Sequence, residues 1–171
     1  MLPNQVCRRT FAHPKGAACA ALLLLLGGCS SMPFLSNEPP SLEFTLVADP
    51  MLNSCGQDRG LPLFFHVVQV TDASLLTGTT PEQVWTREDQ IFGDALLKDA
   101  QQKSFYEDFV DPGKSKVIAV ERNPKAKYVI FLGNYCQSQN ACWYYTSPLK
   151  KTGGQKVSLA LGSSCVTSIK R

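Results

Sequence analysis

Cysteine is the residue type whose chemistry stands out in this sequence of 171 residues. Seven cysteines are present, and a thiol can form a disulfide, bind a metal or accept a covalent group. Cys29 differs from the others because it directly follows an uncharged, leucine-rich segment that ends in two glycines. The segment before it therefore decides how the other cysteines are interpreted.

That segment has the features of a secretory signal. Arg8, Arg9 and Lys15 precede an apolar run over residues 17–26, and no acidic residue occurs before Glu38. A basic start, a short apolar run and small residues before a cleavage point are typical of a signal peptide. Because about 20 apolar residues are needed to span a bilayer, the run is too short to predict a membrane-spanning helix.

The last four residues, Leu26-Gly27-Gly28-Cys29, resemble the lipobox of bacterial lipoproteins. In such proteins the cysteine is diacylated, the signal is cleaved before it, and the new N terminus is acylated. The resemblance implies a signal peptide over 1–28 and lipidation of Cys29, and several acyl chains suit stable anchoring. Ser30 in place of aspartate resembles a signal for sorting to the outer membrane, with the domain on the periplasmic face. The alternative is an ordinary signal peptide with a chance cysteine.

Cleavage after residue 28 would leave 143 of the 171 residues, enough for one domain with a substantial core. It would remove three of the 17 basic residues and none of the 14 acidic residues, so the mature chain has no net formal charge. Composition therefore predicts no general basic surface, and nucleic acid is not an expected partner.

Four cysteines remain for the folded domain: Cys55, Cys136, Cys142 and Cys165. An even number in an exported protein predicts two disulfides, with three possible connectivities. A zinc site is the alternative, but isolated cysteines without a C-x-x-C pair suit it poorly. Because Cys136 and Cys142 flank a turn-like segment, we predict that they pair with each other, which leaves Cys55 to pair with Cys165.

The rest of the mature chain is typical of a mainly β domain. Residues 29–41 form the lipidated N terminus and a tether rich in proline and serine, which can reach roughly 35–40 Å when extended. The domain is expected over 42–171, with β-prone runs over 42–48, 63–71, 116–120, 128–135, 143–146, 157–161 and 165–169. Short strands at near-regular spacing indicate a β-sandwich.

A helical insertion is expected over about 82–108, with one or two short helices over about 88–103. The pattern of the next stretch, Gln102–Asp111, suits either a strand or a helix. Thr80 is expected to cap a helical turn that begins at Pro81. Before it, the segment Asp49–Gly60 breaks the β pattern with two glycines, a proline and three charges. Twelve residues exceed an ordinary hairpin connection, and long ordered loops on β scaffolds tend to carry function. Cys55 indicates that this loop is pinned by a disulfide.

The order of these pieces resembles the outer-membrane lipoprotein family of type VI secretion systems, called TssJ or SciN. The resemblance covers roughly residues 42–170. The matching pieces are Phe44-Thr-Leu-Val-Ala-Asp-Pro-Met-Leu-Asn53, Leu61-Pro-Leu-Phe-Phe-His-Val-Val-Gln-Val70, Asp89-Gln-Ile-Phe-Gly-Asp-Ala-Leu-Leu97, Asp111-Pro-Gly113 and Tyr128-Val-Ile-Phe-Leu-Gly-Asn-Tyr135 followed by Trp143.

The resemblance implies a transthyretin-like β-sandwich with a small helical insertion. It also implies a structural bracket that binds the periplasmic C-terminal domain of the inner-membrane protein TssM. In the family, this contact runs through the loop between the first two strands. Here that loop is Asp49–Gly60, so the contact candidates are Asn53, Gln57, Asp58 and Arg59.

Other function classes have less support. The mature chain has one histidine, His66, in the middle of an expected strand, and it lacks the G-x-S-x-G and H-E-x-x-H motifs. We therefore expect no enzyme activity, no cofactor and no metal. Two alternatives remain: a small-ligand carrier whose pocket is lined by Phe64-Phe65 and Trp143-Tyr144-Tyr145, or a structural lipoprotein of another envelope machine.

Overall fold

The computed structural model describes residues 40–99, 101–138 and 142–169. The expected signal peptide, Cys29 and nearly all of the tether lie outside these residues. Within them, no helix is long and apolar enough to cross a membrane. The elements are β1 (Ser41–Ala48), β2 (Leu63–Val70), η1 (Ser74–Leu76), α1 (Pro81–Phe92), η2 (Gly93–Ala95), β3 (Leu96–Leu97), β4 (Phe105–Val110), β5 (Ser115–Glu121), β6 (Tyr128–Gly133), β7 (Tyr144–Pro148), β8 (Gln155–Leu161) and β9 (Val166–Ser168).

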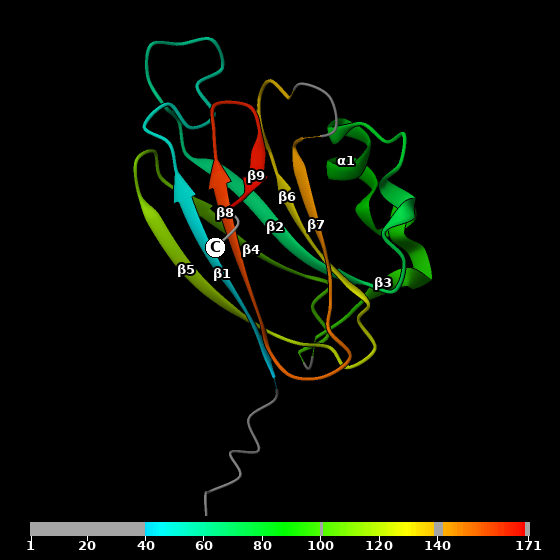
Figure 1. Cartoon of the computed structure of the whole chain (residues 1–171). Coiled ribbons are helices and arrows are strands. Elements are labelled where there is room, and N and C mark those ends of the chain that lie inside the picture. Colours follow the sequence, from blue (N-terminus) through cyan, green and yellow to red (C-terminus); the bar gives the residue numbers. More distant parts are fainter. Residues whose placement is uncertain (1–39, 100, 139–141, 170–171) are drawn as a thin grey trace, which may run out of the picture. The chain divides into compact units, whose positions relative to one another are not determined.

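Two sheets form a sandwich, which confirms the predicted fold class (Figure 1). One sheet has the strand order β5-β1-β8-β9, and in it β1 and β8 run parallel. In the other, β3-β2-β6-β7, strand β4 also pairs with β2, over Leu63–Val68, while β3 pairs with the last two residues of β2. The first strand begins at Ser41, one residue before the expected start of the domain.

The burial of each strand follows from the layers on its two sides. In β1, Leu42, Phe44 and Leu46 point into the core, and the residues between them are at least partly exposed. In β2 almost every residue is buried, because this strand is covered on both faces. Its inward face carries Phe65, which stacks on Phe131 with ring centroids 5.0 Å apart. Alternation marks a strand with one covered face, and a continuous apolar run marks a strand with two.

The second face of β2 is covered by α1. Thr80 caps this helix, as predicted, through a capping box with Gln83. His66, which is buried, holds the helix to the sheet: its Nδ1 lies 2.9 Å from Glu88 Oε2, and its ring stacks on Phe105 at 4.1 Å. The histidine is therefore a packing residue between a strand and a helix.

The predicted extent of the helical insertion is wrong. Helix α1 covers residues 81–92, earlier than the expected 88–103, and helical structure ends at Ala95 rather than near 108. Within 102–111, where the pattern suited either a strand or a helix, residues 105–110 form strand β4. Phe105 and Phe109 are four residues apart, a spacing that places side chains on one face of either a helix or a strand. Here they lie on the strand face that meets Phe64 and His66.

Two Phe→Ala substitutions test the assignment of the core. Phe65 is fully buried, so Phe65→Ala is expected to lower the free energy of unfolding by about 3–5 kcal/mol. Phe109 is 56% exposed, so Phe109→Ala is expected to cost much less. Urea denaturation with both disulfides intact measures the two values. A loss for Phe65→Ala that is as small as the one expected for Phe109→Ala would contradict the place of Phe65 in the core.

Candidate partner-binding loop

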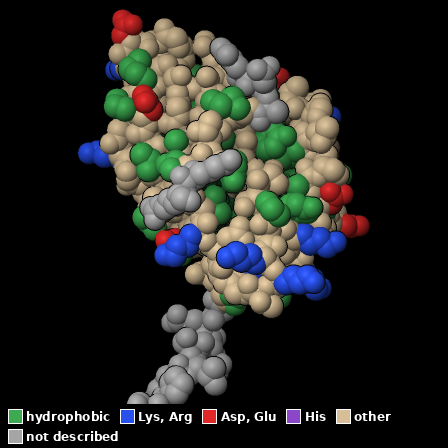
Figure 2. Space-filling view, viewed as in Figure 1, with side chains coloured by type: hydrophobic (Ala, Val, Ile, Leu, Met, Phe, Trp, Pro, Cys, Tyr) green, Lys and Arg blue, Asp and Glu red, His purple; other side chains and the backbone are tan. Residues whose placement is uncertain are grey.

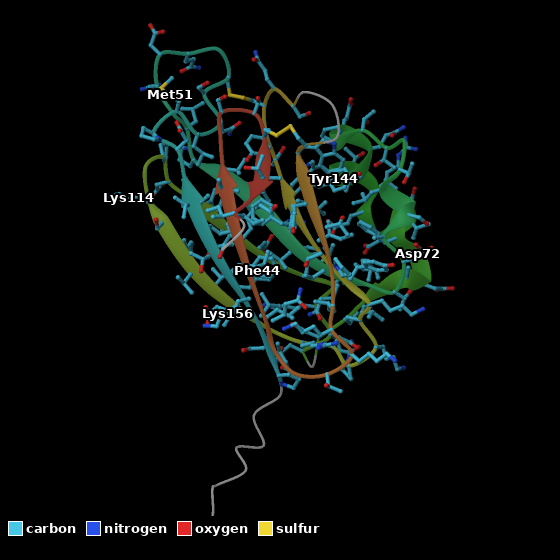
Figure 3. The ribbon with its side chains drawn as sticks, viewed as in Figure 1. Phe44, Met51, Asp72, Lys114, Tyr144 and Lys156 are labelled. Atoms are coloured by element: carbon cyan, nitrogen blue, oxygen red, sulfur yellow. A yellow bond between two sulfur atoms is a disulfide. The ribbon has the colours of Figure 1, made fainter. Side chains whose placement is uncertain are left out.

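The loop between β1 and β2 lies at one end of the sandwich, and the described chain begins at the other end (Figure 1). Strand β1 connects the two ends, and its eight residues span about 26 Å. Figure 3 shows Met51 in this loop, whereas Lys156 lies toward the end at which β1 begins. The loop is therefore on the part of the domain farthest from the point of chain entry.

Backbone hydrogen bonds fix the base of the loop to its neighbours. Asp49 N–H donates to Leu161 C=O at 2.9 Å, and Gly113 N–H donates to Asp49 C=O at 3.1 Å. Leu52 is fully buried and belongs to the core cluster. Gly60 closes the loop where a Cβ would lie 2.3 Å from the Pro50 carbonyl oxygen, so only glycine fits there. The base of the loop is thus an ordered part of the domain.

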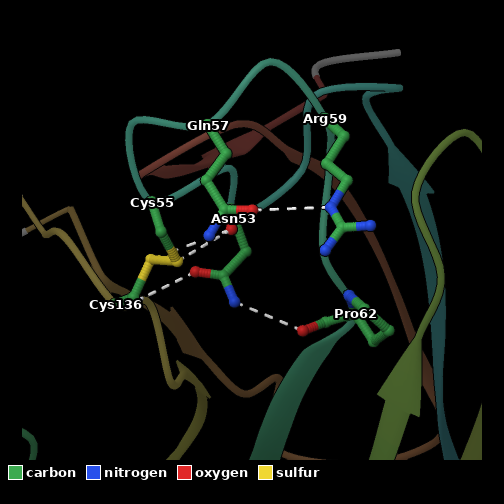
Figure 4. Close-up of a disulfide and its surroundings, with 6 residues drawn as sticks. All are labelled: Asn53, Cys55, Gln57, Arg59, Pro62 and Cys136. Carbon is green, nitrogen blue, oxygen red and sulfur yellow. Dashed lines mark hydrogen bonds between the residues drawn. A yellow bond between two sulfur atoms is a disulfide. The ribbon is translucent and has the colours of Figure 1, made fainter.

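Asn53 braces the loop from within, as Figure 4 shows. Its Nδ2 donates to the Pro62 carbonyl at 3.2 Å, and its Oδ1 accepts from the Cys136 N–H at 2.9 Å. Its backbone has φ +47°, a conformation that asparagine tolerates better than most residues. Asn53 is 7% exposed, so its expected place on the contact surface is not what the structure shows. This residue shapes the loop and its side chain is not presented to a partner.

A disulfide joins the same loop to the β6–β7 connection. Cys55 pairs with Cys136, with Cα atoms 5.6 Å apart, and Cys142 pairs with Cys165 at 5.0 Å. The prediction of two disulfides is confirmed, but the predicted pairing, Cys136 with Cys142 and Cys55 with Cys165, is wrong. Cys136 lies next to the β1–β2 loop, and Cys142 lies next to the β8–β9 connection. The Val166 N–H also donates to the Cys142 C=O at 2.8 Å.

Tyr135, the residue before Cys136, is buried. Its ring lies against Gly133, where a Cβ would be 2.6 Å from a ring carbon. Burial raises the pKa of the Tyr135 phenol well above its usual range, so the side chain is neutral and serves as packing. The segment that receives the disulfide is therefore itself anchored in the domain.

The outward part of the loop carries polar and charged side chains. Gln57, Asp58 and Arg59 are all exposed, and Arg59 Nε lies 3.4 Å from Gln57 Oε1. Met51 is also exposed, at 38%, and was not among the sequence candidates. Met51 and Leu52 are adjacent apolar residues in one loop. Leu52 is in the core, and Met51 is exposed. Methionine and arginine are both enriched at protein interfaces.

The other candidate sites have little support in the described residues. A cleft of about 620 Å³ lies between the edge strands β4 and β5 and is lined in part by Val67, Tyr106 and Val120. None of the five aromatic residues expected to line a ligand pocket borders it: Phe64, Phe65, Trp143, Tyr144 and Tyr145. Trp143 and Phe65 are instead in the core. Among the described residues, no group of three or more potential ligands could hold a metal ion.

Comparison with known families identifies the chain. The model of the type VI secretion lipoproteins (VasD, EvfM, TssJ) matches residues 40–164. The chain belongs to this family. The family is one of structural secretion lipoproteins, so the chain is not an enzyme. A sequence search of curated proteins finds no match.

Solved structures share the fold of this type VI secretion lipoprotein at low sequence identity. Lip from Serratia marcescens, a membrane-bound component of the type VI secretion system, is 15% identical with a TM-score of 0.68 over 78% of this chain and 98% of its own. The lipoprotein TssJ1 from Pseudomonas aeruginosa is 17% identical with a TM-score of 0.65 over 78% and 97%. A chain in the structure of the TssM C-terminal domain from EAEC is 12% identical with a TM-score of 0.61 over 77% and 99%.

The disulfide pairing gives a direct test by mass spectrometry. In a Cys55→Ser variant, the thiol left without its partner should be that of Cys136. Alkylation without reduction, followed by tandem mass spectrometry, locates the label. A label on Cys165 would instead support the pairing that the sequence alone predicted.

The internal role of Asn53 separates it from its exposed neighbours. Asn53→Ala would leave the Cys136 N–H and the Pro62 C=O without their side-chain partner, so we expect a loss of about 1–3 kcal/mol in the free energy of unfolding. Gln57→Ala, on the same loop but exposed, is expected to change it by less than about 0.5 kcal/mol. Denaturation curves measure the free energy of unfolding of both variants. Similarly small losses in the two would contradict the role of Asn53 in bracing the loop.

Proposed function

We propose that this type VI secretion lipoprotein is anchored in the outer membrane through Cys29 and acts as a structural bracket. In this proposal, it faces the periplasm and binds the periplasmic C-terminal domain of the inner-membrane component TssM. The contact surface is the outward part of the β1–β2 loop: Met51, Gln57, Asp58 and Arg59. The family match and the membrane-bound relative support the class of function.

The observation that carries the site is the order of the loop combined with its exposure. Its base is fixed by backbone hydrogen bonds, by Asn53 and by the Cys55–Cys136 disulfide, whereas Gln57, Asp58 and Arg59 face solvent. A loop held in one conformation loses less entropy when a partner binds, so more of the contact energy remains as affinity. The loop also exposes an arginine and a methionine, two residue types that are enriched at interfaces.

The positions of the chain entry and of the loop, at opposite ends of the domain, also suit a bracket. The chain enters at Pro40, and the loop lies at the far end of β1. A lipid at Cys29 would therefore hold one end of the domain near the membrane and leave the opposite end free for a partner that reaches in from the inner membrane. The proline-rich tether sets how far the domain extends.

Calorimetry with the purified TssM periplasmic domain tests the proposal. The soluble chain from Ser30 is suitable because every described strand and both disulfides lie within residues 41–168. We expect binding in the micromolar range or tighter, weakened tenfold or more by Gln57→Ala/Asp58→Ala/Arg59→Ala, because these side chains make the contact.

The matched control changes three exposed lysines at the opposite end, Lys125→Gln/Lys150→Gln/Lys151→Gln, and should bind TssM like the unaltered chain. Loss of binding in the control alone would move the site to the other end of the domain. No binding by the unaltered, fully oxidised chain would remove TssM as the partner.

A further inference from the structure

The end of the sandwich at which the described chain begins is rich in lysine. Among the described residues, seven exposed lysines lie on or beside the β3–β4, β5–β6 and β7–β8 connections, and we call them the basic pole: Lys98, Lys103, Lys125, Lys127, Lys150, Lys151 and Lys156. Figure 2 shows basic side chains gathered at this end, close to the point where the described chain starts.

Hydrogen bonds hold these connections and the chain entry together. The Arg122 N–H donates to the Pro40 carbonyl at 2.9 Å, and the buried guanidinium of Arg122 donates to the Lys150 carbonyl. Asn123, the next residue, donates from Nδ2 to the Lys98 carbonyl at 2.7 Å. The basic pole is therefore one ordered surface around Pro40, and its lysines come from three separate connections.

Acidic side chains offset only part of this charge. Glu43 pairs with Lys156 at 2.9 Å, and Asp99 Oδ1 accepts the backbone N–H groups of Gln101 and Lys103. Three more acidic side chains are exposed at this end: Asp72, which lies near Lys127, Asp94 in η2, which precedes β3, and Glu121 at the end of β5. The seven lysines outnumber these five acidic side chains, so the basic pole has a surplus of positive charge.

We propose that the basic pole binds the anionic headgroups of the membrane surface in which Cys29 is anchored. The inference rests on one part of the proposed function, the lipid anchor at Cys29, and does not depend on the binding of TssM. Cys29 precedes Pro40 by eleven residues, which span at most about 40 Å, so this end of the domain is the part that the anchor keeps near the lipid. Clustered lysines next to an anchor are attracted to anionic lipid within a Debye length of about 8–10 Å.

Contact at the basic pole would orient the domain as well as strengthen anchoring. Strand β1 runs from Pro40 to the β1–β2 loop, so a pole that rests on the headgroups directs that loop away from the membrane. A flexible tether alone fixes a distance but no direction. The anchor and the pole act together, because the anchor raises the effective concentration of the pole at the surface.

Vesicle cosedimentation of the soluble chain from Ser30, without Cys29, tests the lipid contact. We expect binding to phosphatidylcholine vesicles that contain phosphatidylglycerol at low salt, little binding to phosphatidylcholine alone, and loss of binding at about 0.5 M salt. Lys125→Gln/Lys150→Gln/Lys151→Gln should weaken binding roughly 100-fold, at about fivefold for each lysine. Arg59→Gln/Arg87→Gln/Lys114→Gln removes the same charge from exposed sites on other elements and should have a much smaller effect.

Three outcomes would overturn the proposal: no binding to anionic vesicles at low salt, equal loss in both triple variants, or equally tight binding to a DNA duplex at the same salt. The last would assign the pole to polyanions in general. Calorimetry with the TssM domain separates this proposal from the proposed function. The lysine variant should keep TssM binding, and the Gln57/Asp58/Arg59 variant should keep vesicle binding, so each proposal can fail without the other.

Discussion

The structure of the candidate site depends on the attachment of the β1–β2 loop to the β6–β7 connection. Asn53 and Cys55, two residues apart, both connect to Cys136, one through a side-chain oxygen that accepts a backbone N–H and the other through a disulfide. A connection of this length would otherwise sample many conformations, and its ordering would cost conformational entropy when a partner binds. Because the hydrogen bond and the disulfide order the loop when the domain folds, this entropy is lost before the partner binds. The exposed residues at 57–59 are therefore presented by an ordered loop.

The two ends of the sandwich have different chemical characters. One end carries the pinned loop with a methionine and three polar or charged side chains, and the other carries the chain entry and the basic pole. The central layers separate them by the length of β1, and α1 is fixed to β2 through His66 and Glu88. The chain belongs to the type VI secretion lipoproteins and is not an enzyme. In the function that we propose, the domain connects two attachments, one at each end.

Much of the fold could be predicted from the sequence, because alternation along β1 and the apolar run of β2 reflect one covered face and two covered faces. The helix cap at Thr80 could also be predicted, because it depends only on neighbouring residues. The extent of the helices could not be predicted, since Phe105 and Phe109 suit a helix or a strand. Only the pairing of β4 with β2 decides between the two structures. Disulfide pairing likewise depends on which loops meet at one end of the sandwich. The burial of Asn53 depends on Pro62 and Cys136, the latter 83 residues away, which no local pattern reports.

The central claim is that the loop binds its partner because it is held in place before binding. The most direct measurement is the affinity for the TssM periplasmic domain of Cys55→Ser/Cys136→Ser, compared with Cys142→Ser/Cys165→Ser, both under conditions where the domain stays folded. The account predicts that removal of the first disulfide weakens binding about tenfold or more, and that removal of the second has a clearly smaller effect. Unchanged affinity in a folded Cys55→Ser/Cys136→Ser variant would contradict it.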